Sequence, residues 1–256
     1  MRVFLFVPCY IDQLYPKVAE SACLVLRHLG CDVIFPTNQT CCGQPAYNTG
    51  YFDETRLMAM HEVNAFLKFQ SSIKGENIRF NLTHDYIVGL SGSCVAMIRN
   101  FYPGLLSNDA VFADHIGDFV SRVFEFTEFI NKVIKIENFK GRLDAVISYH
   151  DSCHSLRELG LRDEARNILK RIDGLNLVEL PDGETCCGFG GTFAVKFPEI
   201  SSAMADEKLA NLESTGADIL VSGDVSCLMH MQGRARRRHL NQRFAHIAEI
   251  MAESIV

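Results

Sequence analysis

The chain has 256 residues, of which 48% are hydrophobic and 22% are charged, and its formal net charge is −6. This composition is typical of a soluble globular protein and argues against a disordered chain. The negative charge argues against a nucleic-acid partner, because proteins that bind nucleic acids usually present a basic surface. No apolar run reaches the roughly 18 to 20 residues that a membrane-spanning helix needs, so no membrane span is expected.

The N-terminal apolar run, Met1 to Val7, favours a buried strand rather than a signal peptide. It is shorter than the usual apolar core of a signal peptide and leads directly into Pro8 and Cys9. Without an export signal, the expected location is the cytoplasm. In that reducing compartment, grouped cysteines more often bind metal or carry out redox chemistry than form structural disulfides.

Hydrophobic patterns predict alternating strands and helices in the first half of the chain. Strands are expected at 2–7, 32–36 and 84–90, and helices at 16–29, at 53–70, from Ser91 through Ile98, and at 118–136. Ser91 is the expected N-cap of its helix. Continuous apolar strands separated by helices are typical of a parallel sheet covered on both faces.

The second half repeats this order after an expected linker at 137–143. Strands are expected at 145–149, 175–180 and 218–222, and helices at 162–172, 199–212 and 239–253. We therefore predict an α/β protein of two tandem, pseudo-symmetric βαβ-type repeats with parallel sheets. The expected domains are residues 1–137 and 144–256.

The cysteines show the same internal repeat. The tetrapeptide Thr-Cys-Cys-Gly occurs at 40–43 and again at 185–188, and eight of the ten cysteines recur in the same order in both halves. The two quartets are Cys9, Cys41, Cys42 and Cys94, and Cys153, Cys186, Cys187 and Cys227. Only Cys23 and Cys31 stand outside the pattern, and we expect them to pack in the core.

All eight repeated cysteines follow the carboxyl ends of predicted strands, where functional groups of open parallel sheets gather. Four thiols from three loops can therefore converge in each half. Gly43, Gly188 and Gly190 are expected to let the backbone pass close to a bulky cofactor. His150 and His154 flank Cys153 and are candidate neighbours or substitute ligands of a metal site, although a surface position is an equal alternative.

Four thiolates can bind zinc or an iron–sulfur cluster. The chain has no C-x-x-C sequence, which structural zinc sites commonly use. Adjacent cysteines fit one tetrahedral ion poorly, but each can bind a different iron of a cluster. The pattern therefore favours an iron–sulfur cluster, and it leaves zinc and cofactor-free thiol chemistry as alternatives.

The doubled pattern resembles the cysteine-rich CCG domain found in heterodisulfide reductases and in the iron–sulfur proteins of glycolate and glycerol-3-phosphate oxidases. Within that group the chain is most similar to the lactate-utilisation protein A family, over essentially its whole length. The segments that carry the similarity are VFLFVPCY, QTCCGQPAYNTGY, SGSCVAMIRNFYP, YHDSCHSLRELG and TCCGFGGTFAVKFPEIS.

The resemblance implies a cytoplasmic bacterial protein that acts with two partners, the lactate-utilisation proteins B and C, in oxidising L-lactate to pyruvate. It implies that the two quartets are cluster ligands, with one or two clusters per chain. Domains of the heterodisulfide reductase type end in C-x-x-C and have five thiols, whereas this chain has Ser91 and Asp224 at the first of those positions. Four thiols fit a [4Fe–4S] cluster.

The expected role is therefore electron transfer rather than catalysis by this chain alone. No convincing flavin or nicotinamide motif is present, so hydride removal from a small hydroxy acid needs a cofactor on another chain. Two alternatives remain at this stage: a component of a thiol/disulfide reductase, and a scaffold whose clusters are structural.

Overall fold

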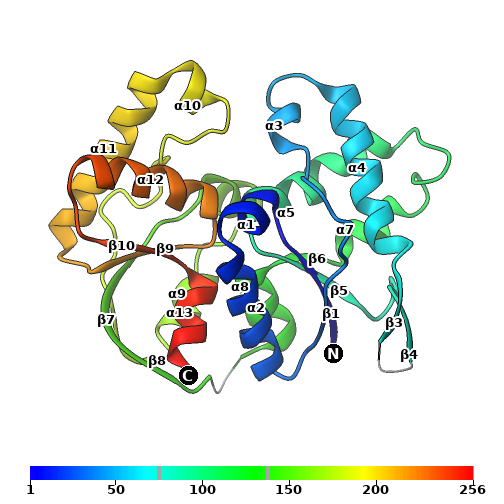
Figure 1. The fold of residues 1–256 in the computed structure, drawn as a ribbon, viewed down its shortest axis with the longest axis horizontal. Helices are drawn as coiled ribbons and strands as arrows, with labels where there is room; N and C mark the ends of the chain where they lie inside the picture. The colour runs from blue at the N-terminus through cyan, green and yellow to red at the C-terminus, as the bar shows by residue number, and fades with distance from the viewer. Residues whose placement is uncertain (74–75, 137–138, 256) are drawn as a thin grey trace.

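The computed structural model describes residues 1–73, 76–136 and 139–255. Within these residues the chain forms two four-stranded sheets, and every strand pair found in them is parallel. The two sheets lie side by side with helices around them (Figure 1). The predicted α/β architecture of two parallel-sheet repeats is thereby confirmed.

The two sheets have the same topology. The first has the order β2-β1-β5-β6 and the second the order β10-β9-β7-β8, and in each the strands that carry the cysteine loops at their carboxyl ends are neighbours. The strands are β1 (Arg2–Phe6), β2 (Asp32–Ile34), β5 (Tyr86–Gly89), β6 (Val123–Glu125), β7 (Gly141–Tyr149), β8 (Ile172–Leu177), β9 (Ile219–Ser222) and β10 (Arg243–His246). A separate antiparallel hairpin joins β3 (Gln70–Ile73) to β4 (Glu76–Arg79).

Helices connect these strands, and three of the helical segments in the described part of the chain are π-helical. Those of the first half are α1 (Cys9–Leu14), α2 (Pro16–His28), α3 (Gln44–Tyr47), α4 (Phe52–Leu67), α5 (Gly92–Ala96), η1 (Met97–Phe101), α6 (Tyr102–Leu106), α7 (Ile116–Ser121), α8 (Phe126–Glu128) and η2 (Phe129–Ile134). Those of the second half are η3 (His154–Glu158), α9 (Glu164–Leu169), α10 (Phe193–Lys196), α11 (Pro198–Thr215), α12 (Val225–Arg237) and α13 (Ile247–Ser254).

The predictions of continuous helices at 118–136 and 239–253 were wrong, because each of these segments contains a strand. The strands are β6 and β10, which are short and lie at the same edge of their respective sheets, beside β5 and β9. Each is followed at once by a helix with a capping box, whose N-cap is Glu125 in one half and His246 in the other. The apolar pattern of that helix hides the strand before it.

Other boundaries also differ from the predictions. The helix expected at 53–70 ends at Leu67 and is followed by the β3–β4 hairpin. Strand β7 begins at Gly141, so residues 141–143 of the expected linker are strand, while 137–138 lie outside the described residues. Strand β8 begins three residues before the expected 175–180. The domain limits at 137 and 144 stay a prediction.

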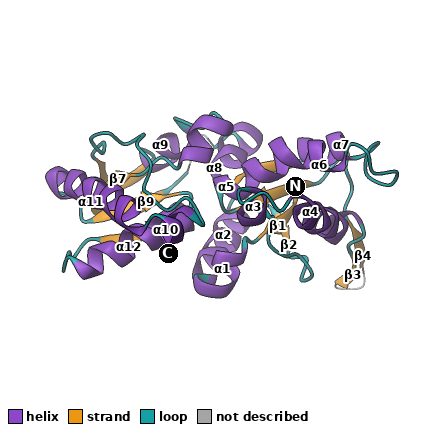
Figure 2. Cartoon of the chain, turned by 90° about the horizontal axis from the view of Figure 1, so that it is seen from above, coloured by secondary structure: helices purple, strands orange, loops and turns teal. Residues whose placement is uncertain are grey.

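One hydrophobic core is shared by both halves. It contains Val3 and Val25 from the first half together with Ile147 and Met251 from the second. Helices α2 and α13 pack against each other in this shared region, and the view from above shows α2 and α5 between the strands of the two sheets (Figure 2). Each half has a further core of its own.

The contact between the halves is close where α5 meets η3. A Cβ atom added to Gly92 would lie 1.8 Å from the hydroxyl oxygen of Ser155, so a side chain there would force Ser155 to move. Among the described residues, no helix has the length and apolar character needed to cross a membrane.

Candidate metal centre

All eight repeated cysteines line a single cavity between the two halves. Its volume is about 120 Å³, and its wall also includes Tyr10, Ser91, His154, Gly190 and Asp224. The cysteines come from corresponding places, because Cys9 begins α1 after β1 and Cys153 precedes η3 after β7. The predicted convergence therefore occurs, and both quartets face the same space.

The first quartet forms a chain of sulfur contacts. Hydrogen bonds link the side chains of Cys9 and Cys41, of Cys41 and Cys42, and of Cys42 and Cys94. The backbone amide of Gly43 also donates to the Cys41 sulfur at 3.5 Å. The hydrogen bonds from Cys42 and Cys9, with that of the Gly43 amide, lower the pKa of Cys41 to about 3. Cys41 is therefore the thiolate around which the other thiols are arranged.

The second quartet repeats this arrangement. Cys186 receives hydrogen bonds from Cys153 and Cys187, and Cys187 is also linked to Cys227. Backbone amides of Gly188 and Phe189 donate to the sulfurs of Cys186 and Cys187 at 3.3 Å and 3.5 Å. The hydrogen bonds from Cys153 and Cys187 lower the pKa of Cys186 to about 2. Each half thus stabilises one thiolate with the same geometry.

Gly43 and Gly188 set the path of the two cysteine loops. Their φ angles are +82° and +88°, in the left-handed region that favours glycine. A Cβ atom on Gly188 would lie 2.5 Å from the backbone oxygen of Ser201, and one on Gly43 would lie 3.1 Å from a methyl group of Thr55. At Gly188 and Gly43 the cysteine loops therefore pass close to helices α11 and α4. Gly190 lies in the cavity wall.

Ser91 and Asp224 contact each other across the boundary between the halves. The Ser91 hydroxyl donates to Asp224 Oδ2 at 3.1 Å, and the amide of Ser93 donates to the same oxygen at 3.2 Å. Ser91 is at the N-cap of α5 as predicted, but its side chain does not cap that helix. Asp224 does cap α12, since its Oδ1 accepts from the Ser226 amide at 3.1 Å.

His150 lies next to the second quartet and has no polar partner. Its side chain is fully buried, and neither ring nitrogen has a hydrogen-bond partner among the described residues. A ring nitrogen of His150 and the sulfurs of Cys187 and Cys227 all lie within 4.8 Å of one another. Burial lowers the pKa of His150 to about 3, so the ring is neutral and can offer a lone pair or an N–H group.

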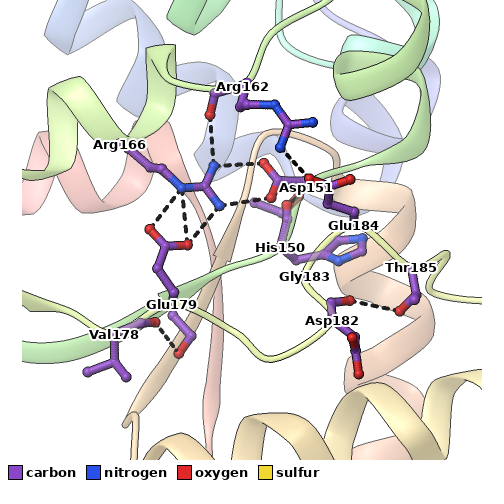
Figure 3. A network of polar contacts seen from close by, with 12 residues as sticks. His150, Asp151, Arg162, Arg166, Val178, Glu179, Asp182, Gly183, Glu184 and Thr185 are labelled. Atoms are coloured by element: carbon purple, nitrogen blue, oxygen red, sulfur yellow. Dashed lines mark hydrogen bonds and ion pairs between the residues drawn. The ribbon is translucent and has the colours of Figure 1, made fainter.

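The residues around His150 have structural roles. Both Asp151 oxygens accept hydrogen bonds from Arg166, at 2.9 Å and 2.8 Å, and Arg166 also pairs with Glu179. In Figure 3 the Asp151 carboxylate points to Arg166, while the His150 ring extends toward the segment of Gly183 and Thr185. His154 lies in the cavity wall, with its Nε2 3.6 Å from a Glu158 oxygen.

Sequence patterns did not single out two buried charged residues near the cysteines, Glu62 and Lys208. Glu62 Oε2 accepts from the amide of Thr40 at 2.8 Å, and burial raises the pKa of this carboxyl to about 7. Lys208 Nζ donates to the backbone oxygens of Asp182 and Gly183 at 2.6 Å and 2.8 Å. Both lie among the buried residues of their helices. Their helical spacing from the apolar residues of the same helix is the sequence signal that could have identified them.

The residues present fit an iron–sulfur centre in each half. Each quartet offers four sulfur ligands, one of them already a thiolate, with backbone N–H groups directed at sulfur. The His150 ring is buried next to Cys187 and Cys227, and its nitrogens have no hydrogen-bond partner among the described residues. This also indicates that a further group belongs at the second site.

The chain matches the family described as "Cysteine-rich domain" (CCG) twice, over residues 3–99 and 147–232. It is 40% identical to lactate utilization protein A of Exiguobacterium sp. over 254 residues, which are 99% of this chain and 98% of that protein. It is also 40% identical to lactate utilization protein A of Halalkalibacterium halodurans, covering 98% of this chain and 96% of that one. Lactate utilization protein A 2 of Bacillus cereus is 37% identical, with coverages of 100% and 99%.

Among solved structures, a hypothetical protein from Helicobacter pylori superposes with a TM-score of 0.64 at 12% identity. The similarity covers 99% of this chain and 49% of that one, so this chain spans about half of its length. At that identity the likeness shows a shared fold alone.

Proposed function

The chain belongs to the lactate utilization protein A family, and from that premise we propose that it is the iron–sulfur component of a multi-protein system that oxidises L-lactate to pyruvate. Its role is to carry electrons from that reaction to an acceptor, in the cytoplasm. The observation that supports this most is the convergence of two cysteine quartets on one cavity.

In this proposal each quartet holds a [4Fe–4S] cluster. Cys9, Cys41, Cys42 and Cys94 are the ligands of the first, and Cys153, Cys186, Cys187 and Cys227 those of the second. Such clusters supply one-electron storage and transfer. The amides of Gly43, Gly188 and Phe189 would stabilise the negative charge on ligand sulfur.

Oxidation of lactate to pyruvate releases two electrons and two protons. The sequence has no convincing flavin or nicotinamide motif, so the group that takes up hydride belongs to a partner. We assign that role to the partner system of lactate-utilisation proteins B and C. The hydroxy acid then meets this chain only through the complex.

The test is anaerobic purification followed by counting iron and acid-labile sulfide per chain. Two cubane clusters give about eight of each, with a visible absorption band that bleaches on reduction. L-Lactate should bleach the band only when both partner proteins are present. Absence of iron and sulfide after anaerobic reconstitution would overturn the proposal.

The competing function is a thiol/disulfide reductase, which the low pKa of Cys41 and Cys186 favours because thiolates are the reactive form. It predicts that the chain alone reduces a disulfide substrate. Adjacent cysteines form only a strained disulfide, which makes them poor partners for each other. A chain that contains iron and leaves disulfides untouched contradicts this alternative.

A further inference from the structure

The two halves carry an acidic and a basic side chain at one matched buried position. Glu62 is the eleventh residue of α4 and Lys208 is the eleventh residue of α11, the helices that follow the two cysteine loops. Their side chains are 0% and 1% exposed. The burial patterns of these helices match around them, since Ala59 and Val63 correspond to Ala205 and Leu209.

Each of these side chains reaches back to the segment before its own cysteine pair. Glu62 binds the amide of Thr40, the residue directly before Cys41. Lys208 binds the backbone oxygens of Asp182 and Gly183, three residues and more before Cys186. Burial lowers the pKa of Lys208, and thiolates at Cys187 and Cys153 act against this by stabilising its charge. Burial raises the pKa of Glu62, and a thiolate at Cys41 adds to that rise.

A second matched position also differs between the two halves. Phe6 and His150 each lie three residues before the first cysteine of their half, and both are fully buried. Phe6 pairs with Gly89 of β5, and the backbone oxygen of His150 accepts a hydrogen bond from the hydroxyl of Ser222, the last residue of β9. The first half therefore has an apolar ring where the second has an imidazole near Cys187 and Cys227.

Both differences favour reduction of the second half over reduction of the first. Adding an electron makes a cluster and its thiolates more negative, so a nearby cation and N–H donors stabilise the reduced state. A carboxylate destabilises it, and an apolar ring offers no hydrogen bond. Both effects are strong in a buried site, because the effective dielectric constant is lower than in water.

We propose that Lys208 and His150 give the second-half quartet the higher reduction potential of the two, so that a single electron added to the chain resides there. Glu62 and Phe6 keep the first-half quartet at the lower potential. The inference rests on the proposed function, because it requires a cluster in each quartet. The electron comes from dithionite in the test below, and dithionite is the species oxidised.

The experiment is a redox titration of the full chain, reconstituted anaerobically and followed by electron paramagnetic resonance. A Cys41→Ala/Cys42→Ala chain reports the second quartet, and a Cys186→Ala/Cys187→Ala chain reports the first. We expect the second quartet to have the higher midpoint potential of the two. Lys208→Met should lower the potential of the second site, and the equilibrium constant for its one-electron reduction should fall about tenfold, which corresponds to about 59 mV.

Matched variants separate charge from packing. Lys208→Arg keeps the charge and should restore the potential, while His150→Phe places the first-half residue in the second half and should lower it. Glu62→Gln keeps the hydrogen bond to Thr40 and should raise the potential of the first site in a titration at pH 8, where Glu62, with a pKa of about 7, is ionised. Because Glu62→Gln acts on the other half, it tests the inference even where Lys208→Met fails to fold.

Three results would overturn the inference: equal potentials, the reverse order, or iron in only one half. A chain without any iron refutes the proposed function and this inference together. A chain with two clusters that lactate and its partners cannot reduce refutes the proposed function, but the order of potentials is still measured with dithionite. The two failures are therefore distinguishable.

Discussion

The hydroxyl of Ser91 and the carboxylate of Asp224 meet at 3.1 Å, and these two residues occupy the same position in the two halves. Each lies three residues before the last cysteine of its quartet. By the resemblance to heterodisulfide reductase domains, a fifth thiol is expected at this position. Here the two side chains bind each other across the boundary between the halves.

We expect Asp224→Ala to lower the free energy of unfolding by about 2 to 4 kcal/mol, since it removes the cap of α12 and leaves the Ser93 amide and the Ser91 hydroxyl buried without this acceptor. Ser91→Ala should cost about 1 kcal/mol. Urea denaturation of both single variants and of the double variant gives the coupling between them. Strictly additive losses would contradict a direct interaction.

The cysteines are expected to divide into two independent ligand sets. Cys42→Ala should remove the iron of the first half and Cys187→Ala that of the second, so each should lose about half of the iron and sulfide. Cys23→Ala is the matched control, because Cys23 lines a different cavity beside Leu24 and Phe35. Loss of iron in Cys23→Ala would contradict the assignment.

The two loop glycines should differ in their sensitivity to substitution. Gly188→Ala places a Cβ 2.5 Å from a backbone oxygen that side-chain rotation cannot move, whereas Gly43→Ala meets a threonine methyl group at 3.1 Å. Both also carry the cost of left-handed backbone, about 1 kcal/mol. We expect Gly188→Ala to lower the melting temperature and second-half iron content more than Gly43→Ala does in the first half. Equal losses would count against this geometry.

Glu125 should make stability depend on pH. Burial raises its pKa from 4.5 to about 7, so the folded state binds a proton that the unfolded state releases above 4.5. Its contribution is favourable below pH 4.5 and is lost as the pH rises to 7, by at most about 3 kcal/mol. Glu125→Gln keeps an oxygen for the amides of Thr127 and Glu128.

The measurement is the free energy of unfolding from pH 5 to pH 8 for both chains. The difference between Glu125→Gln and the unsubstituted chain should grow in favour of the variant up to pH 7 and then level off. Comparing the two chains cancels other titrating groups. A difference that does not change with pH would show that Glu125 ionises normally.

The alternation of strands and helices and the register of the cysteines could be read from the sequence, because each depends on local patterns. Strands β6 and β10 could not, since they are short edge strands directly before helices capped by Glu125 and His246. Their omission in both halves has one cause. The apolar periodicity of the following helix extends into the strand and outweighs it.

The common cavity was also beyond the sequence, because it depends on how the two sheets pack through α2 and α13. The sequence predicted one site per half, each built from its own loops. The roles of Glu62 and Lys208 were hidden for a related reason. A charged residue on a helix is normally solvated, and only the packing of α4 and α11 shows that these two are not.

The tight contact between Gly92 and Ser155 has a consequence for how electrons could reach the cysteines. With 1.8 Å between a Cβ at Gly92 and the Ser155 hydroxyl oxygen, and with one core continuous through both halves, we expect no hinge motion that opens and closes the cavity. Control of turnover then lies outside the chain. Under the proposed electron-transfer role, a redox partner sets the rate by when it docks and how near it comes, and this chain serves as a fixed relay with a constant internal distance.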